Sequence, residues 1–269
     1  MGTVAKTNKS DSSSHWYYSD GRACYELPKK DGKGMKSTTL ADARKLNLLP
    51  SVTTILRVLH KQALVEWLIE QACLAVLTSP RNEGEELDAF VYRILHTEKV
   101  QDQESNAARD RGTEMHAALE MMFEGRTAEV DQDMIPWVQP AYKAIVARGP
   151  TISTERVVVG NGYAGKVDLI QSGLDSVWLW DWKTTKKVPD KAWSEHRLQL
   201  SAYAKAYADT SISPVNVGNV YISTVEQGKF SICEHDVWPQ TYEFGFAPLV
   251  EHWCWTTGYR HNASELLTP

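Results

Sequence analysis

The sequence predicts an α/β protein, in which a mixed central β-sheet is flanked by helices and preceded by an N-terminal helical region. From Pro50 to about Gly149 the pattern is mainly helical, and at Pro150 it changes to strand-like alternation. Three strands then follow in "ISTERVVV", "GYAGKVDLIQS" and "SVWLWDWK". A helix over about 190–208, a second hairpin and a C-terminal helix complete the chain. Helices therefore stand before, between and after the strands, as a layered α/β fold requires.

Three regions are predicted along the chain. Residues 1–15 have little to bury and are expected to form a disordered tail. Residues 16–105 are expected to form a hairpin and helical region, and residues 106–269 the core domain. Within the helical region, "KQALVEWLIEQACLAVL" is apolar nearly all round and is predicted to be a buried helix.

The composition is that of an ordinary globular protein, with 42 % hydrophobic and 23 % charged residues in a chain of 269. The most apolar run, 64–77, is interrupted by Glu66, Glu70 and Gln71, so no membrane partner is expected. No secretory signal is evident, and a cytoplasmic location with reduced thiols is expected, in a bacterial or phage-infected cell. No two of the four cysteines form a CxxC pair, which disfavours a zinc ribbon or an iron–sulfur cluster.

The segment "VWLWDWKTTKK" alternates as a strand and carries an acid and a base on one face. Its three tryptophans, Trp178, Trp180 and Trp182, point one way and are predicted to pack against a helix. Asp181 and Lys183 point the other way. A lone acid and lysine at this spacing is common by chance, so its meaning depends on what lies beside it.

The preceding strand brings a second acid to the same place. With a turn centred near Leu174, Asp168 lies opposite residues around Trp180 to Asp181, and the register is open by one or two residues. Two neighbouring carboxylates repel each other unless a proton or a cation lies between them. Hard oxygen ligands favour Mg²⁺ or Mn²⁺, and Lys183 could offset charge on a reacting phosphate. The alternative is that Asp168 caps a turn or pairs with Lys166.

A histidine on the helix "ARDRGTEMHAALE" is the candidate third ligand. His116 lies at the edge of the stripe formed by Met115 and Leu119, and it shares a face with Glu120 and Arg109. A neutral imidazole there could bind a metal, although a lone histidine on a helix is more often structural.

Together these residues resemble the PD-(D/E)XK nuclease superfamily, specifically its RecB-type branch without an iron–sulfur cluster. The resemblance is carried by "GTEMH", "GYAGKVDLI", "WDWKTT" and "QLSAYAKAY", and spans about residues 107–210. The upstream "LPSVTTILRVLHKQALVEWL" is also similar to the lead-in of phage-type exonucleases of this branch. The resemblance implies a restriction-endonuclease-like core over residues 106–269.

It also implies roles for single residues. His116, Asp168, Asp181 and the backbone carbonyl of Trp182 would hold the metal, and Lys183 would be the catalytic lysine with Asp181 and Asp168. Gln199 and Tyr203 match the Q-x-x-x-Y motif of the branch and would help to position DNA or the metal site. Further candidate DNA contacts are Arg109, Arg111, Thr184 and Lys186.

Charge is distributed in a way that suits this expectation. The net charge of −5 by itself weighs against a nucleic-acid-binding protein. Residues 183–205, however, carry six Lys/Arg against two acids and could hold a phosphate backbone, although a solvated helix face remains the alternative. Trp16, Tyr17 and Tyr18 are expected in an exposed hairpin and could stack on bases of a single strand.

The sequence therefore predicts an Mg²⁺- or Mn²⁺-dependent DNA exonuclease, acting in phage or recombination and repair end processing. Its expected partners are DNA single strands or duplex ends, and a single-strand annealing or binding protein. The alternatives are a structure-specific or restriction-like endonuclease and a catalytically inactive DNA-binding module.

Overall fold

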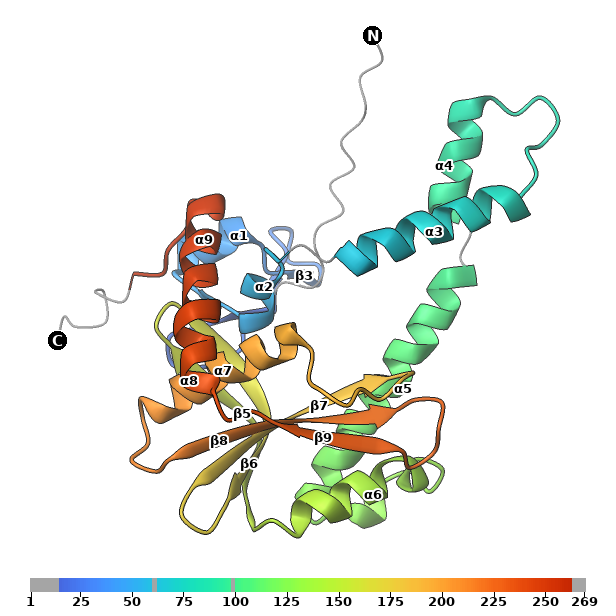
Figure 1. Ribbon diagram of the computed structural model, residues 1–269. Coiled ribbons are helices and arrows are strands. Elements are labelled where there is room, and N and C mark those ends of the chain that lie inside the picture. Colours follow the sequence, from blue (N-terminus) through green and yellow to red (C-terminus); the bar gives the residue numbers. More distant parts are fainter. Residues whose placement is uncertain (1–14, 60–61, 98–99, 263–269) are drawn as a thin grey trace.

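The computed structural model describes residues 15–59, 62–97 and 100–262 (Figure 1). No side chains are described for 62–64, 67–68 and 95–109. The predicted disordered tail, residues 1–15, therefore lies outside the described residues except for His15.

A five-stranded mixed sheet forms the centre of the fold. Its strands lie side by side in chain order, β5 (Thr151–Gly160), β6 (Tyr163–Ser172), β7 (Val177–Thr185), β8 (Val215–Ser223) and β9 (Phe230–Glu234). Only β7 and β8 are parallel within it, and the chain between them runs through α7 (Ser194–Ala208), as a parallel connection requires. The predicted α/β fold with a mixed central sheet is confirmed.

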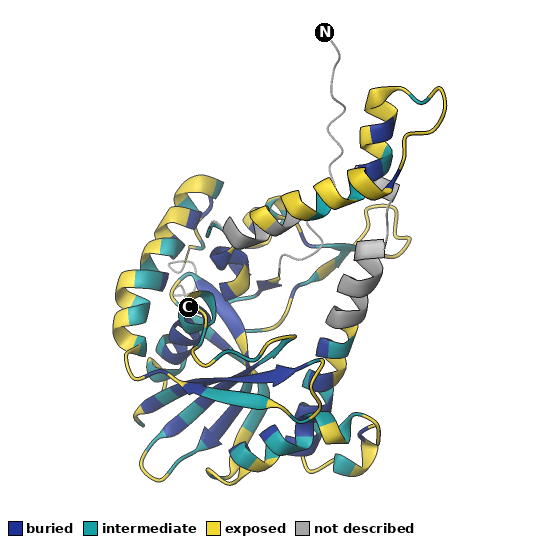
Figure 2. Cartoon of the chain, turned by 45° about the vertical axis from the view of Figure 1, so that its right-hand side comes forward, coloured by how far each residue is buried: buried dark blue, intermediate teal, exposed yellow. Residues whose placement is uncertain are grey.

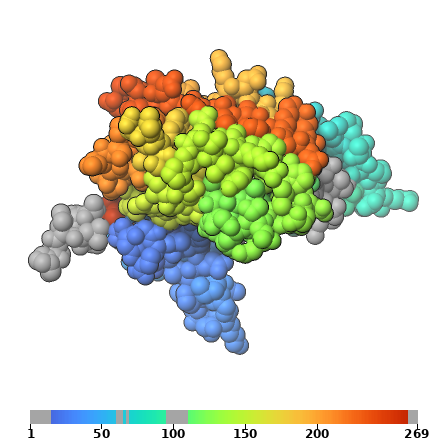
Figure 3. All heavy atoms as spheres, turned by 90° about the horizontal axis from the view of Figure 1, so that it is seen from below, coloured from blue at the N-terminus to red at the C-terminus, as the bar shows by residue number. Residues whose placement is uncertain are grey.

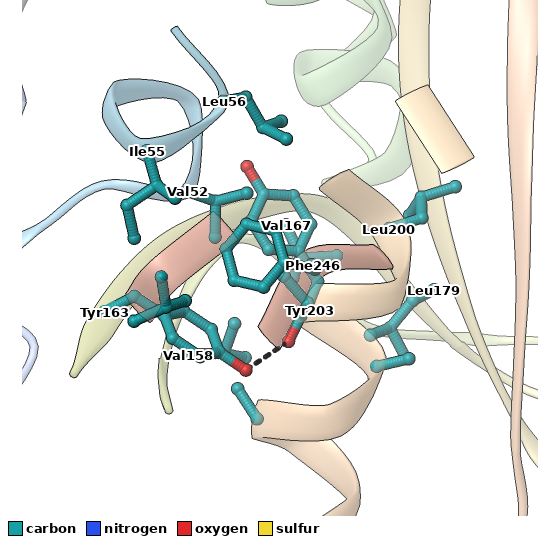
Figure 4. Close-up of a cluster of buried hydrophobic side chains, with 14 of the residues drawn as sticks. Val52, Ile55, Leu56, Val158, Tyr163, Val167, Leu179, Leu200, Tyr203 and Phe246 are labelled. Carbon is teal, nitrogen blue, oxygen red and sulfur yellow. Dashed lines mark hydrogen bonds between the residues drawn. The ribbon is translucent and has the colours of Figure 1, made fainter. Parts of the chain in front are cut away.

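Helices cover both faces of this sheet. On one face lies α7, with α2 (Val52–Leu56) and α9 (Ala247–Thr257) packed beyond it. On the other face lie α5 (Val100–Phe123) and α6 (Ile135–Val146), which fill the centre of the view in Figure 3. Two separate clusters of buried apolar side chains result, one on each side of the sheet. Figure 4 shows part of the α7-side cluster, where the Tyr163 hydroxyl donates to the Ala202 carbonyl at 3.0 Å.

The alternation of β7 divides its side chains between these two clusters. Leu179 belongs to the α7-side cluster, whereas Trp180 and Trp182 belong to the cluster under α5 and α6. A Cβ at Gly218 would lie 2.3 Å from the Trp180 ring, so only glycine on β8 leaves room for that indole. The prediction that these tryptophans pack against a helix is confirmed, and Trp182 stacks on Phe123 of α5 with ring centroids 5.5 Å apart.

The N-terminal segment packs into the α7-side core. Its short elements are β1 (Trp16–Tyr17), β2 (Glu26–Pro28), β3 (Met35–Ser37), α1 (Leu40–Leu46) and β4 (Leu49–Pro50). Trp16 and Tyr17 are only 1 % and 2 % exposed, so the expected exposed stacking hairpin is wrong for these two residues. The physical reason is a contact far along the chain, because Trp16 packs against the rings of Trp253 and Tyr259.

The helix predicted to be buried is largely exposed. α3 (Gln62–Thr78) and α4 (Leu87–Thr97) contact each other and extend away from the sheet (Figures 1 and 2). Ile69 and Leu77 of α3 are 59 % and 81 % exposed. An apolar surface on all sides predicts burial only if a core surrounds the helix, and here the body of the protein does not.

The remaining described elements are short, η1 (Thr127–Glu129), α8 (Trp238–Thr241) and the π-helical turn η2 (Tyr242–Phe246) that leads into α9. The four cysteines are all free thiols. In the part of the chain that the structure describes, no helix is both long and apolar enough to cross a membrane.

The same leucine-to-alanine substitution at two positions tests the difference in burial between α2 and α3. Leu56→Ala, at a side chain that is 1 % exposed, is expected to lower the free energy of unfolding by about 2–5 kcal/mol because it leaves a cavity. Leu77→Ala on the exposed side of α3 is expected to change it by less than about 0.5 kcal/mol. Urea denaturation measures both, and equal losses would show that α3 is buried as deeply as α2.

Candidate active site

The two predicted acids meet where β6 and β7 separate. The paired register between these strands ends at Leu169 and Trp180, and the next residues are Asp168 and Asp181. In place of a ladder bond, the Asp168 carboxylate accepts the backbone N–H of Trp182 at 2.7 Å. The sheet therefore opens at this point and leaves two carboxylates side by side.

An irregularity in β5 and β6 accompanies this opening. Val167 and Leu169 belong to different apolar clusters, so the strict alternation of β6 is interrupted at Asp168. On the adjacent strand β5, Glu155 lies beside Asp168 and has a φ of 49°, a left-handed backbone that a non-glycine residue rarely adopts. Glu155 forms an ion pair with Lys166 of the neighbouring strand β6.

Asp181 is held by two donors. It is 1 % exposed, and its Oδ2 atom accepts from the Lys183 ammonium at 2.6 Å and from the Asn219 amide at 3.0 Å. The parallel register pairs Asp181 directly with Asn219 on β8, so the backbone itself sets this contact. A buried carboxylate with two such donors has a fixed orientation.

Burial, followed by the charge of Asp181, raises the pKa of Asp168 to about 7. Lys183 and the N–H of Trp182 oppose that shift and are too weak to cancel it. At neutral pH the pair therefore favours either a shared proton or a cation between the carboxyl groups.

His116 approaches the same opening from α5. Its Nδ1 atom lies 3.9 Å from Asp168 Oδ2. Burial and the neighbouring Lys183 charge lower the pKa of His116 to about 4, so the imidazole is neutral at pH 7 and keeps a lone pair for a metal. α5 can lie this close to the end of β7 because a Cβ at Gly112 would be 2.6 Å from Thr184 Oγ1.

The donor set fits a divalent cation in its chemistry. Two carboxylates and a neutral imidazole converge on one opening, and hard oxygen ligands suit Mg²⁺ or Mn²⁺. Within residues 15–59, 62–97 and 100–262, however, no three His, Cys, Asp or Glu side chains are already gathered at metal-binding spacing. Metal binding at Asp181 would therefore require the Lys183 ammonium to move away from Asp181 Oδ2.

The predicted Q-x-x-x-Y pair lies above the acids on α7. The Gln199 amide donates to the Tyr203 hydroxyl at 2.8 Å, and both side chains are buried. The Tyr203 ring rests on Gly165 of β6, where a Cβ would be only 2.2 Å away. Burial, with a further contribution from Asp181, raises the pKa of Tyr203, so its hydroxyl remains protonated beside the acids.

The other predicted DNA contacts are dispersed. The Arg111 guanidinium lies over the ring of Trp137 on α6, 4.0 Å from its centroid, and so makes a contact within the protein. Thr184 faces Gly112, and Lys186 is exposed beyond the end of β7. The side chain of Arg109 lies outside the described residues.

Sequence reasoning missed two buried polar residues next to Asp181. Because the Asn219 amide nitrogen donates to Asp181, its carbonyl oxygen faces His235 and accepts from His235 Nε2 at 2.8 Å. Burial, followed by the charge of Arg197, lowers the pKa of His235 to about 4, so this histidine is neutral. The available signal was an asparagine within the otherwise apolar strand "VGNVYIS".

One comparison with known proteins points to a superfamily. Residues 142–243 match the sequence profile of the PD-(D/E)XK nuclease superfamily. No curated protein matches the chain. Among solved structures, SSO0001 is 14 % identical with a TM-score of 0.35, over 71 % of this chain and 86 % of its own. The "Putative exonuclease" of Eubacterium rectale is 11 % identical with a TM-score of 0.37, over 57 % of this chain and 71 % of its own.

The buried neutral state of His235 predicts a pH effect on stability. Its pKa is about 4 in the folded protein and about 6.5 in the unfolded chain, so its contribution is present above about pH 6.5 and is lost as the pH falls to 4. His235→Gln keeps a donor for Asn219 and is expected to reduce the loss of unfolding free energy between pH 6.5 and 4. The exposed His252→Gln is the control. Parallel pH profiles for wild type and His235→Gln would contradict the neutral assignment.

Proposed function

We propose that this protein, whose residues 142–243 match the sequence profile of the PD-(D/E)XK nuclease superfamily, is a divalent-metal-dependent exonuclease that hydrolyses DNA phosphodiesters. One observation carries the proposal. Asp168 and Asp181 lie side by side where the β6–β7 ladder ends, and Lys183 stands one pleat beyond on the same face as Asp181.

The proposed metal ligands are His116, Asp168, Asp181 and the Trp182 carbonyl. If Mg²⁺ or Mn²⁺ were held by these residues, it would supply a water of lowered pKa as the nucleophile and polarise the phosphoryl oxygen. The raised pKa of Asp168 supports this set, because a second positive charge beside the pair would stabilise both carboxylates in the ionised form.

Lys183 is proposed to stabilise charge at the scissile phosphate. Its ammonium is 2.6 Å from Asp181 and its side chain is 20 % exposed, so it can turn from the carboxylate towards a substrate. A phosphoryl group gains negative charge on its oxygens during hydrolysis, and a neighbouring ammonium offsets that charge. Asn219 meanwhile keeps Asp181 oriented when Lys183 moves.

The preference for an exonuclease rests on the likeness of "LPSVTTILRVLHKQALVEWL" to phage-type exonucleases. That likeness also underlies the proposed role in phage or recombination and repair end processing, with DNA ends as substrate and a single-strand annealing or binding protein as partner. The competing functions are a structure-specific endonuclease and an inactive DNA-binding module. The intact set of two acids and a lysine weighs against the inactive module.

A cleavage assay tests the proposal. End-labelled linear DNA should be degraded with Mn²⁺ or Mg²⁺ and be stable with EDTA. Lys183→Ala should lower kcat by at least about 100-fold, because one preorganised charge is lost, while DNA binding in EDTA persists. Lys143→Ala, an exposed lysine on α6, is the control and should cleave as wild type does.

The same assay separates the alternatives. Cleavage of closed circular DNA at the rate of linear DNA would identify an endonuclease. DNA binding without cleavage in either metal would identify the inactive module and overturn the proposal.

A further inference from the structure

An exposed tryptophan, Trp193, contacts Tyr221, which is the strand neighbour of the proposed catalytic lysine. The parallel register that pairs Asp181 with Asn219 also pairs Lys183 with Tyr221, two residues further along both strands. Because the Asp181 and Asn219 side chains bond to each other, and side chains alternate along strands, Lys183 and Tyr221 share their face of the sheet. The fully buried Tyr221 is therefore the neighbour of Lys183.

Tyr221 fixes the start of α7 above this face. Its hydroxyl accepts the backbone N–H of Trp193 at 3.1 Å and lies 2.8 Å from His196 Nδ1. The Trp193 ring meets the Tyr221 ring edge-on at 5.6 Å, and lies 5.1 Å from the His196 ring. Both the backbone and the ring of Trp193 are thus held in place by Tyr221, and the ring also lies against His196.

Trp193 nevertheless remains 49 % exposed. By contrast, Trp180 and Trp182 of β7 are only 0 % and 2 % exposed. An indole that is already immobilised pays little further conformational entropy when a flat partner covers its free surface. The exposed surface of Trp193 is therefore suited to bind a planar ring.

The segment that leads to Trp193 is basic. Lys186, Lys187 and Lys191 are all exposed, and Asp190 is the single acid among residues 186–193. The segment starts at the end of β7, directly after the proposed catalytic strand, and ends at α7. A positive track beside an exposed aromatic ring is the combination that binds single-stranded nucleic acid, in which lysines hold phosphates and the ring stacks on a base.

We propose that Trp193 is a stacking subsite for an unpaired or terminal nucleobase, adjacent to the phosphate that Lys183 contacts. This inference rests on the proposed nuclease function and adds a substrate class to it, since a base inside an intact duplex cannot present its face to an indole. In this proposal the exposed Lys186, Lys187 and Lys191, in the segment that leads to Trp193, bind the neighbouring phosphates.

Binding of a short single-stranded oligonucleotide in EDTA tests the subsite without cleavage. Trp193→Ala should weaken binding by about 5- to 150-fold, the range expected for one stacked base, and Trp193→Phe should retain part of the affinity. Trp255→Ala, an 80 % exposed tryptophan on α9, is the matched control and should bind as wild type does. Thermal unfolding of each variant checks that the fold is intact.

Abasic substitution identifies the partner of the ring. One abasic site is moved along the oligonucleotide. At a single position it should weaken binding to wild type by as much as Trp193→Ala weakens binding to the intact oligonucleotide. At that position, combining the abasic site with Trp193→Ala should cause no further loss of affinity. With metal present, Trp193→Ala should raise KM more for single-stranded DNA than for blunt-ended duplex DNA.

Two results would overturn the subsite. The first is an oligonucleotide affinity of Trp193→Ala equal to that of wild type. The second is that, at every abasic position, the loss of affinity caused by the abasic site adds in full to the loss caused by Trp193→Ala. These results are separable from a failure of the nuclease proposal. A protein that binds with the predicted base dependence but never cuts retains the subsite and loses the enzyme, whereas a variant that binds and cuts like wild type does the reverse.

Discussion

The separation of β6 from β7 beyond Leu169 and Trp180 is the constraint on which the site depends. A continued ladder would satisfy the backbone N–H of Trp182 with a carbonyl, but here the Asp168 carboxylate accepts it. The same opening leaves Asp168 next to Asp181 in a buried environment, which raises the pKa of Asp168. The two buried carboxylates therefore repel each other when both are ionised, and a cation of suitable size bound between them would relieve that repulsion.

Both helical layers converge on this opening through positions that lack a Cβ. Gly112 lets α5 lie against Thr184, which brings His116 to Asp168, and Gly165 accommodates the Tyr203 ring of α7. β8 contributes from beside β7, where Asn219 connects Asp181 to His235. The site is therefore built by the sheet and by elements on both of its faces, and the N-terminal segment supports it indirectly by packing against α7.

The sequence predicted what depends on local periodicity. Alternation of β7 separated Trp180 and Trp182 from Asp181, and the length of the hairpin brought Asp168 opposite Asp181 within a residue or two. It could not predict Asn219 or His235, because their contact with Asp181 requires knowledge of which strand lies beside β7. The burial of Trp16 depends on Trp253, and the exposure of α3 on the absence of a core around it, so neither follows from local pattern.

The most direct measurement is anomalous X-ray diffraction from crystals of the protein grown with Mn²⁺. We predict one strong anomalous peak between the Asp168 and Asp181 carboxylates, within bonding distance of both, which disappears in Asp168→Asn. A peak bound elsewhere on the chain, or no peak at a Mn²⁺ concentration that supports DNA cleavage, would contradict the shared cation site.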